Sequence, residues 1–287
     1  MVRTGSIIAL LVGLMTQAAT QAGWAVLREV DFHVDFYDVS WSPDGATALA
    51  YGYDGGLVRT TDAGVQWQQI DPGTEYDLNG LAWQDTSNVW ICGSDSVGWG
   101  SSGVLLTSSD GGATWRTVIN DHPTVFDDVF FLDYNNGWLS APGAELLRTT
   151  DGGGVWNPIP LVDVEVGTME FVDPSIGFSA GGLFAFDLNK TTDGGLTWTE
   201  LHTTNASITG IDFPTGTTGY ISWLQGVDKS TDGGLSWSNK LDVPMELLTS
   251  IDFLDVDHGW AVGRLGGGGE QSAVVRRTTD AGATWEL

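Results

Sequence analysis

An octapeptide that recurs six times along the chain is the feature that most constrains the fold. Every copy fits the pattern [Ser/Thr]-x-Asp-[Gly/Ala]-Gly-x-x-Trp, and the aspartates of successive copies lie 39 to 48 residues apart. Self-similarity at such a period indicates a repeat architecture in which each copy belongs to one supersecondary unit. The copies are Thr60–Trp67, Ser108–Trp115, Thr149–Trp156, Thr191–Trp198, Ser230–Trp237 and Thr278–Trp285.

The residue types of the octapeptide predict a tight turn between two strands. The carboxylate of an aspartate accepts hydrogen bonds from amides of its own turn. Glycine permits a positive φ, and the tryptophan buries a large ring at the start of the return strand. We therefore interpret the six aspartates as structural rather than catalytic or metal-binding: Asp62, Asp110, Asp151, Asp193, Asp232 and Asp280.

A second pattern, apolar-x-aromatic, precedes each octapeptide. This period-2 alternation is typical of a strand with one buried face. A turn and a second strand follow it, a third strand enters the octapeptide, and a fourth leaves it, so each repeat predicts four short antiparallel strands. The six segments with this pattern are Val39–Trp41, Leu81–Trp83, Val129–Phe131, Met169–Phe171, Ile211–Phe213 and Ile251–Phe253.

Repeated four-stranded units of this length predict an all-β fold, a β-propeller with six blades. The alternative is a seven-bladed propeller with one blade incomplete. Residues Trp24–Val30 form a further strand-like segment, which is in position to complete the blade that ends at Leu287 and to close the ring.

The first residues have the layout of a secretory signal. Arg3 precedes an apolar run, Ile7–Met15, and small residues follow at Ala18–Ala22. The apolar run is too short to span a membrane. We predict a signal peptide over residues 1–22, a single propeller domain over 23–287 and a periplasmic or secreted location, with no membrane segment after cleavage. The alternative is an N-terminal helix retained as an anchor.

Composition excludes several classes of partner and cofactor. The chain has 11 Lys and Arg against 37 Asp and Glu, a net charge of −26. Such a surface repels nucleic acids and anionic membranes, whereas a protein partner with a basic surface fits it. Cys92 is the only cysteine, so a Cys-based zinc site is excluded. The four histidines are dispersed, and we expect no metal and no cofactor.

The six octapeptides are similar to Asp boxes, also called BNR repeats. The longer unit, clearest in Val129–Trp156 and Ile251–Trp285, resembles the photosystem II assembly and stability factor family of propellers over about residues 36–287. This resemblance implies a non-enzymatic chaperone or scaffold that acts outside the cytoplasm. Asp boxes also occur in sialidases, xyloglucan hydrolases and sortilin-type receptors, so the motif specifies the fold more strongly than the function.

The distribution of basic residues argues against a sialidase, which needs an arginine cluster on its inner strands. No apolar-x-aromatic segment contains an arginine. We assign no catalytic residue and predict a monomeric scaffold for a protein partner. The alternative is a carbohydrate-binding propeller or a glycoside hydrolase that uses a carboxylate pair. Five basic residues share one scaffold position, three before the aspartate of the octapeptide: Arg59, Arg148, Lys190, Lys229 and Arg277.

Two repeats carry insertions between their second and third strands, at Ser94–Ser102 and Arg264–Ser272. Ring closure would place both insertions beside the corresponding loop of the first repeat, Tyr53–Gly56. Because loops on a rigid scaffold commonly carry binding sites, we hypothesise a partner-binding site there. The alternative is that the insertions are merely tolerated. The hypothetical site comprises Tyr53, Asp54, Asp95, Trp99, Arg264 and Glu270.

Three acids occupy the middle position of the apolar-x-aromatic pattern in the last three repeats: Glu170, Asp212 and Asp252. Neighbouring carboxylates near an axial channel attract a cation or a basic peptide and raise one another's pKa. The alternative is that they form a solvated channel wall.

Overall fold

The computed structural model describes residues 35–95, 102–141, 145–161, 164, 166–180, 187–203, 207–265 and 273–287. The predicted signal peptide and the predicted strand Trp24–Val30 lie outside these residues. Within the described part of the chain, no helix is long and apolar enough to cross a membrane.

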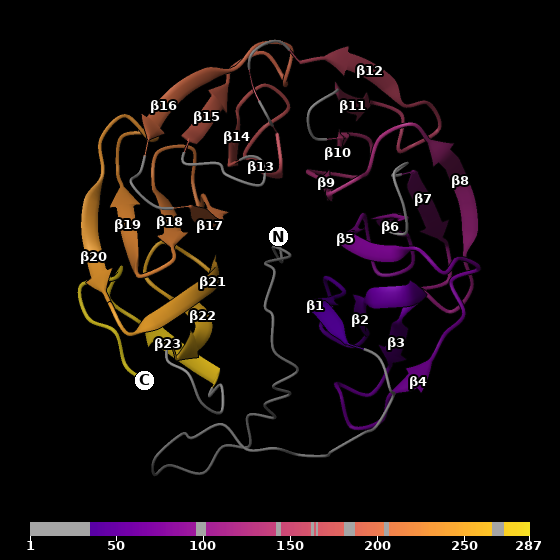
Figure 1. The fold of residues 1–287 in the computed structure, drawn as a ribbon, viewed down its shortest axis with the longest axis horizontal. Coiled ribbons are helices and arrows are strands. Elements are labelled where there is room, and N and C mark those ends of the chain that lie inside the picture. Colours follow the sequence, from indigo (N-terminus) through magenta and orange to yellow (C-terminus); the bar gives the residue numbers. More distant parts are fainter. Residues whose placement is uncertain are drawn as a thin grey trace.

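Six antiparallel sheets stand around a central axis as the blades of a propeller (Figure 1). This confirms the predicted all-β fold with six blades. Within each sheet the strands follow chain order, and the first strand of each blade lies nearest the axis. The first three blades comprise β1 (Phe36–Trp41), β2 (Ala48–Gly52), β3 (Leu57–Thr60) and β4 (Gln68–Gln69); β5 (Asp77–Trp83), β6 (Val89–Ser94), β7 (Gly103–Ser108) and β8 (Arg116–His122); and β9 (Asp128–Phe131), β10 (Gly137–Ala141), β11 (Glu145–Thr149) and β12 (Asn157–Pro160).

The last three blades continue the same order. In blade 6 the described residues form three strands, and the outermost position is taken by a single bridge between Arg277 and Glu286. The strands are β13 (Thr168–Phe171), β14 (Gly177–Ala180), β15 (Asp187–Thr191) and β16 (Thr199–Thr203); β17 (Ile208–Asp212), β18 (Gly219–Trp223), β19 (Gly226–Ser230) and β20 (Ser238–Asp242); and β21 (Glu246–Phe253), β22 (Gly259–Leu265) and β23 (Ala273–Thr278).

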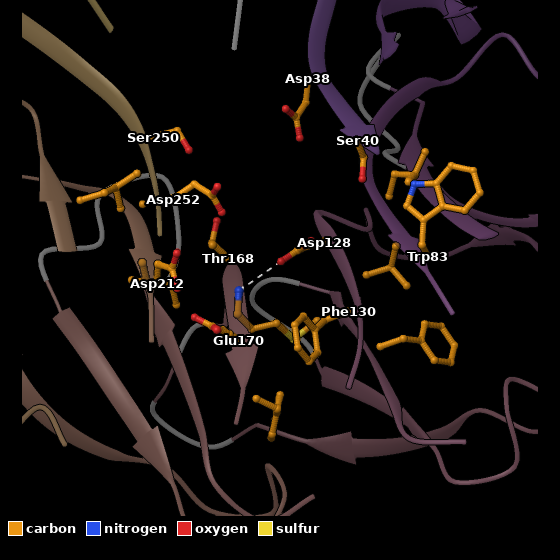
Figure 2. A pocket seen from close by; sticks show the side chains of 18 of the residues that line it. Asp38, Ser40, Trp83, Asp128, Phe130, Thr168, Glu170, Asp212, Ser250 and Asp252 are labelled. Atoms are coloured by element: carbon orange, nitrogen blue, oxygen red, sulfur yellow. Dashed lines mark hydrogen bonds between the residues drawn. The ribbon is translucent and has the colours of Figure 1, made fainter. Parts of the chain in front are cut away.

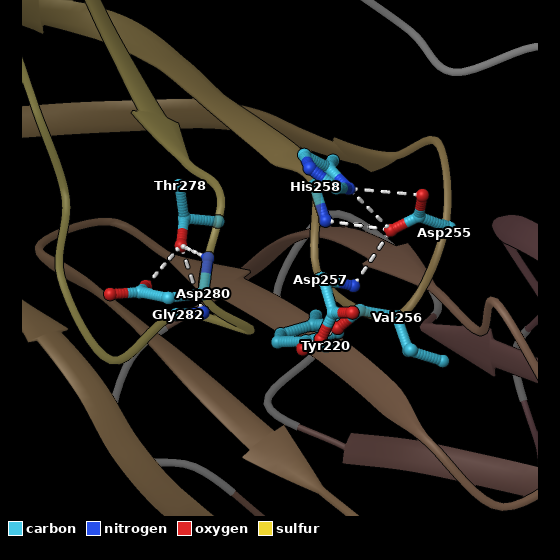
Figure 3. A network of polar contacts seen from close by, with 8 residues as sticks. All are labelled: Tyr220, Asp255, Val256, Asp257, His258, Thr278, Asp280 and Gly282. Carbon is cyan, nitrogen blue, oxygen red and sulfur yellow. Dashed lines mark hydrogen bonds and ion pairs between the residues drawn. The ribbon is translucent and has the colours of Figure 1, made fainter.

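The octapeptide forms a turn closed by its own side chains, as the copy in blade 6 illustrates (Figure 3). The hydroxyl of Thr278 donates to Asp280 Oδ1 at 2.9 Å and accepts the amide of Gly282 at 2.9 Å. Asp280 Oδ1 also accepts the amide of Thr284 at 2.8 Å. The Asp and the hydroxyl thus satisfy amides that the turn would otherwise leave unpaired.

The turn between the first and second strands lies on the same face as the octapeptide turn. In blade 6 the amide of Ala281 donates to the carbonyl of Asp257 at 3.0 Å. Asp255 in that hairpin accepts the amides of Asp257 and His258, and Tyr220 of blade 5 donates to the carbonyl of Val256 at 2.8 Å. The loops between second and third strands therefore lie on the opposite face, here called the top face.

Neighbouring blades are joined by stacked rings and by the repeated basic position. The second-strand ring of one blade stacks on the inner-strand phenylalanine of the next, with centroids 3.5 Å apart for Phe178 and Phe213. Lys190 lies 5.0 Å above the Phe178 ring and donates to the carbonyl of Gly233 in blade 5 at 3.0 Å. These contacts hold the inner strands around the axis at fixed positions.

Candidate functional site

The loop between β2 and β3 is fixed rigidly to the top face. Tyr53 begins a short 3₁₀ turn, and its amide donates to the carbonyl of Asp35 at 3.0 Å. The Tyr53 ring is 46% exposed and lies 4.3 Å from the ring of Tyr37, tilted by 49°. The amide of Asp54, a residue with φ of 52°, donates to Asp77 Oδ1 in blade 2 at 2.9 Å. The turn therefore joins two blades.

Blade 2 contributes further polar groups to the same surface. The hydroxyl of Tyr76 donates to Asp121 Oδ1 at 2.9 Å, and this bond, with the nearby charges of Asp121 and Asp95, raises the pKa of Tyr76. The amide of Asp95 donates to the carbonyl of Ser102 at 2.9 Å, which closes the base of the first insertion. We call this group the tyrosine–aspartate surface: Tyr37, Tyr53, Asp54, Tyr76, Asp77, Asp95 and Asp121.

Burial and the hydrogen bond with Tyr53 raise the pKa of the Tyr37 hydroxyl. Tyr37 and Tyr76 therefore stay protonated at neutral pH, because the ordinary pKa of tyrosine is already about 10. The tyrosine–aspartate surface thus combines aromatic faces, hydroxyl groups and negative charge on one rigid support.

The residues of the hypothetical site fall into two groups. Tyr53, Asp54 and Asp95 lie on the tyrosine–aspartate surface, whereas Arg264 lies near the end of β22, paired with Ala273. Trp99 and Glu270 lie outside the described residues, so the role of the six-residue site stays a prediction. Both insertions do leave their blades between the second and third strands.

Sequence reasoning missed the partners that fix this surface: Tyr37, Tyr76 and Asp77. The pair Tyr76 and Asp77 stands where the inner strand of blade 2 begins, on the top face, and Tyr37 stands near the start of β1. The signal was available in principle, because the first residues of every inner strand lie next to the second-to-third loops.

A cavity of about 160 Å³ lies on the axis between the inner strands. Side chains from the inner strands of all six blades contribute to its wall, and Figure 2 shows polar groups from several blades turned toward it. Glu170, Asp212 and Asp252 line this axial cavity together, as their shared position in the repeat predicts. Two further carboxylates join them, Asp38 and Asp128.

Several of these carboxylates connect one blade to the next. Asp128 accepts the amide of Met169 at 3.1 Å, and Glu170 accepts the amide of Phe213 at 2.6 Å. Asp212, which is buried, accepts the amide of Phe253. The carboxylates of blades 3, 4 and 5 thus each bind the inner strand of the following blade, so they do more than form a solvated wall.

The carboxylates on the blade 1 side have different partners. Asp38 is buried and accepts the hydroxyl of Tyr51 at 2.9 Å and the amide of Val39 at 2.7 Å. Asp38 and Asp128 stand two positions before the middle residue of the apolar-x-aromatic pattern. Because side chains alternate along a strand, these positions face the same side as the middle residue. This alternation was the signal that sequence reasoning missed.

The environment of Asp128 shifts its titration toward neutral pH. Burial raises the pKa of Asp128 to about 7, the charges of Asp127 and Asp38 contribute in the same direction, and the amide of Met169 opposes them. The groups that face Asp128 include, from neighbouring strands, Asp38, Tyr51 and Cys92. Asp128 therefore changes charge in the physiological range.

The described residues contain no group of three or more His, Cys, Asp or Glu side chains arranged to hold a metal ion. Cys92 is buried, and burial raises the pKa of its thiol well above the ordinary value. The thiolate is the reactive form of cysteine, so this environment suppresses nucleophilic chemistry at Cys92.

A scan against protein-family models found no match, and a search of curated proteins found none either. Among solved structures, the chain is similar to YCF48 from Cyanidioschyzon merolae, with 17% identity and a TM-score of 0.66 over 86% of this chain and 83% of that chain. It is also similar to a GH74 xyloglucanase from Xanthomonas campestris, with 14% identity and a TM-score of 0.65 over 86% of this chain and 44% of the enzyme.

An ancestral GH74 enzyme gives a TM-score of 0.57 at 13% identity over 83% of this chain and 38% of that chain. At these identities the likeness shows the propeller fold alone, because one fold hosts unrelated functions. The function has to be argued from the surfaces of this chain.

Proposed function

We propose that the chain is an exported, non-enzymatic β-propeller that docks a protein partner on its tyrosine–aspartate surface. The observation that carries the proposal is the exposed ring of Tyr53, which packs against Tyr37 on a loop that the amide of Asp54 fixes to blade 2. An aromatic anchor that is already ordered loses little conformational entropy when a partner covers it. The resemblance to photosystem assembly factors supports the same reading.

Charge determines the kind of partner that fits. Asp54, Asp95 and Asp121 surround the tyrosines, and the whole chain carries a net charge of −26. A basic segment of the partner would place an arginine or lysine over the Tyr53 ring and pair with these carboxylates. Such docking weakens as ionic strength rises, because salt screens exposed charges.

The axial cavity supports the non-enzymatic part of the proposal. Glycoside hydrolysis needs two carboxyl groups on either side of a bound sugar. Here Glu170 and Asp212 accept amides of neighbouring blades, and Asp38 accepts a tyrosine hydroxyl. The cavity of about 160 Å³ is also smaller than typical ligand pockets, which measure about 300–1,000 Å³.

Export forms part of the proposal and rests on the layout of residues 1–22. Mass spectrometry of the protein recovered from outside the cytoplasm should give an N-terminus at Gly23 and a domain over 23–287. Recovery of a chain that keeps Met1, or recovery from the cytoplasm alone, would contradict export.

Docking is tested by co-purification of the tagged protein at low and high salt, with quantitative mass spectrometry. The comparison uses two single substitutions, Tyr53→Ala and Tyr134→Ala. Tyr134 is the matched control, because it is 55% exposed in the hairpin between β9 and β10, on the opposite face. We expect a stoichiometric partner whose recovery falls about tenfold with Tyr53→Ala and stays unchanged with Tyr134→Ala.

Two results would contradict the proposal. Equal recovery of the partner with both variants would remove the tyrosine–aspartate surface from the interface. Release of sugars from xyloglucan or another glycan by the purified protein would show an enzyme and replace the scaffold function with the glycoside hydrolase alternative.

A further inference from the structure

The junction between blade 6 and blade 1 differs from the other five junctions of the ring. Strands of consecutive blades pack against each other from blade 1 through to blade 6, but in the described part of the chain no strand of blade 6 packs to this extent against blade 1. Figure 1 shows the blade formed by β21–β23, in yellow, standing apart from the blade formed by β1–β4, in indigo. The described strands therefore leave the ring open at this junction.

Two side chains of blade 6 that face the junction, Trp260 and Val275, are only half-buried. Trp260 holds the second-strand position that faces the next blade, and Val275 lies on the same face of the sheet, because Arg277, two residues later, is paired with Trp260. In the other five blades the next blade covers both positions, and every equivalent residue is buried. The equivalents of Trp260 are Leu49, Trp90, Trp138, Phe178 and Tyr220, and those of Val275 are Leu57, Leu105, Leu146, Leu188 and Val227.

The facing side of blade 1 shows the same difference. Val39 and Trp41 are the apolar and aromatic residues of the apolar-x-aromatic pattern in β1, and both are half-buried. In the other five blades both residues of the pattern are buried. The aromatic residue faces the preceding blade, as Phe171 does where it stacks on Trp138 with ring centroids 3.7 Å apart. Exposed apolar surface thus lies on both sides of one junction, and we call Val39, Trp41, Trp260 and Val275 the junction residues.

The repeated basic position gives an independent sign of the open junction. Lys190 and Lys229 donate to backbone carbonyls of the next blade at 3.0 and 3.3 Å, and Arg59 and Arg148 do the same. Arg277 is exposed and lies 6.0 Å from the centre of the Trp260 ring, with no carbonyl acceptor in blade 1 among the described residues. A segment that fills the junction would therefore meet a guanidinium able to bind its carbonyl or carboxylate oxygens.

The chain itself contains a segment that suits this junction. Trp24–Val30 is strand-like and rich in apolar residues, and it precedes β1, the strand of blade 1 that borders the junction. Five residues lie between Val30 and Phe36. Elsewhere the connection from the outer strand of one blade to the inner strand of the next ranges from three residues, between β20 and β21, to seven, between β4 and β5. The connection is therefore long enough for the segment to reach blade 6.

The spacing of tryptophans supports the same placement. In the other five junctions, 15 or 16 residues separate the octapeptide tryptophan of one blade from the inner-strand aromatic of the next, as from Trp115 to Phe131. Trp24 stands 17 residues before Trp41. The segment that begins at Trp24 is therefore close to the register of an outer strand that leads into blade 1.

We propose that Trp24–Val30 docks in the junction between blades 6 and 1 and covers the junction residues. Burial of apolar side chains on both sides drives the docking. The tether to β1 holds the segment at a high effective concentration, which favours it over a second molecule. Docking fixes blade 6 relative to blade 1. This inference does not rest on the proposed binding of a protein partner.

Hydroxyl-radical footprinting of the purified protein, read by mass spectrometry, tests the proposal. We expect Trp41 and Trp260 to react slowly in the wild type and about tenfold faster in a double variant with Trp24→Asp and Val26→Asp, because loss of a buried large apolar side chain weakens docking by at least about that factor. The matched control combines Leu196→Asp and Leu235→Asp, which add the same charges at exposed leucines of two octapeptide turns. This control should leave both rates unchanged.

The buried ring of Trp138 serves as an internal reference. Its slow reaction in every variant would show that the blades stay folded, so that a change at Trp41 and Trp260 reports on the junction alone. Equal reaction rates of Trp41 and Trp260 in the wild type and in the double variant with Trp24→Asp and Val26→Asp would overturn the proposal. It would also be overturned if protection in the wild type disappeared on dilution together with a dimer seen by ultracentrifugation, because a second copy would then cover these residues.

Discussion

Adding one methyl group to the second glycine of an octapeptide should destabilise the propeller far more than adding it to the first. In blade 3 the second glycine is Gly153, with φ of 87°. A Cβ atom there would lie 2.2 Å from Cζ2 of Trp90 in blade 2. The first position is more permissive, because Ala63 and Ala281 already occupy it with φ of 57° and 61°.

The magnitude follows from two separate costs. Alanine in the left-handed region costs about 1 kcal/mol relative to glycine. Overpacking adds about 1–3 kcal/mol when the neighbour has no room to move. Trp90 has little room, because it is 3% exposed and packs against the rings of Phe131 and Trp156 at 5.6 and 5.7 Å. Gly153→Ala should therefore cost about 3 kcal/mol, the sum of these two terms.

The matched control is Gly111→Ala in blade 2. Gly111 has φ of 68°, but a Cβ atom there would meet its nearest neighbours, on Arg59 and Thr86, at 3.4 Å, an ordinary contact. Only the conformational cost of about 1 kcal/mol remains. The difference between the two variants therefore isolates the contact between blades 2 and 3.

The assay is thermal unfolding followed by near-ultraviolet circular dichroism, which reports on the buried tryptophans. For a chain of this size, 1 kcal/mol shifts the Tm by about 2–4 °C. Gly153→Ala should thus lower the Tm by about 6–12 °C and Gly111→Ala by about 2–4 °C. Equal shifts for both variants would refute the reasoning, because they would show that the Trp90 ring yields to the added methyl group.

Three other measurements test the electrostatics of the fold. The first measurement is the Tm of Asp128→Asn minus the Tm of wild type, and this difference should rise from pH 5 to pH 8. The raised pKa of about 7 means that ionisation of Asp128 destabilises the folded wild-type protein, and asparagine does not ionise. A difference that stays constant with pH would contradict this. Hydrogen bonds from Ser236 and Ser230 lower the pKa of Asp232 to about 2. In denaturant titrations, Asp232→Asn should therefore lower the free energy of unfolding at pH 7, and the loss should shrink as the pH falls from 4 to 2. A loss that stays constant with pH would show that the charge of Asp232 does not stabilise the turn. Lys190→Met keeps an aliphatic side chain over the Phe178 ring but removes the hydrogen bond to the carbonyl of Gly233 in blade 5. By thermal unfolding, this substitution should cost about 1 kcal/mol of stability. An unchanged Tm would show that the hydrogen bond does not stabilise the fold.

The fold was predictable because its decisive interactions are local. Each octapeptide carries its own hydroxyl, carboxylate and glycine, and the bonds between Thr278, Asp280 and Gly282 involve residues at most four apart. The apolar-x-aromatic pattern likewise needs only strand alternation. Local chemistry repeated six times fixes the number of blades and the face on which each turn lies.

The candidate surfaces were harder to predict because they join residues far apart in sequence. The contact of Asp54 with Asp77 and the influence of Asp38 on Asp128 both depend on how one blade meets another. Strand alternation identifies which residues face the axis, but it does not reveal that the surroundings of Asp128 raise its pKa to about 7. That property requires the packing of several strands.

The repeat itself shows which polar side chains of the inner strands serve the ring. In blades 4 and 5 the middle position of the inner strand holds Glu170 and Asp212, and each acid binds the next blade, so it serves the ring. In blades 2 and 3 the same position holds Ala82 and Phe130, which carry no polar group, so the ring closes there without a bond from that position. Unpaired buried polar atoms are not confined to departures from the repeat, because the indole N–H groups of Trp156 and Trp285, two tryptophans of the octapeptide, also lack a hydrogen-bond partner. An unpaired buried polar atom therefore does not by itself mark a functional site in this molecule, and the function has to be argued from its exposed surfaces.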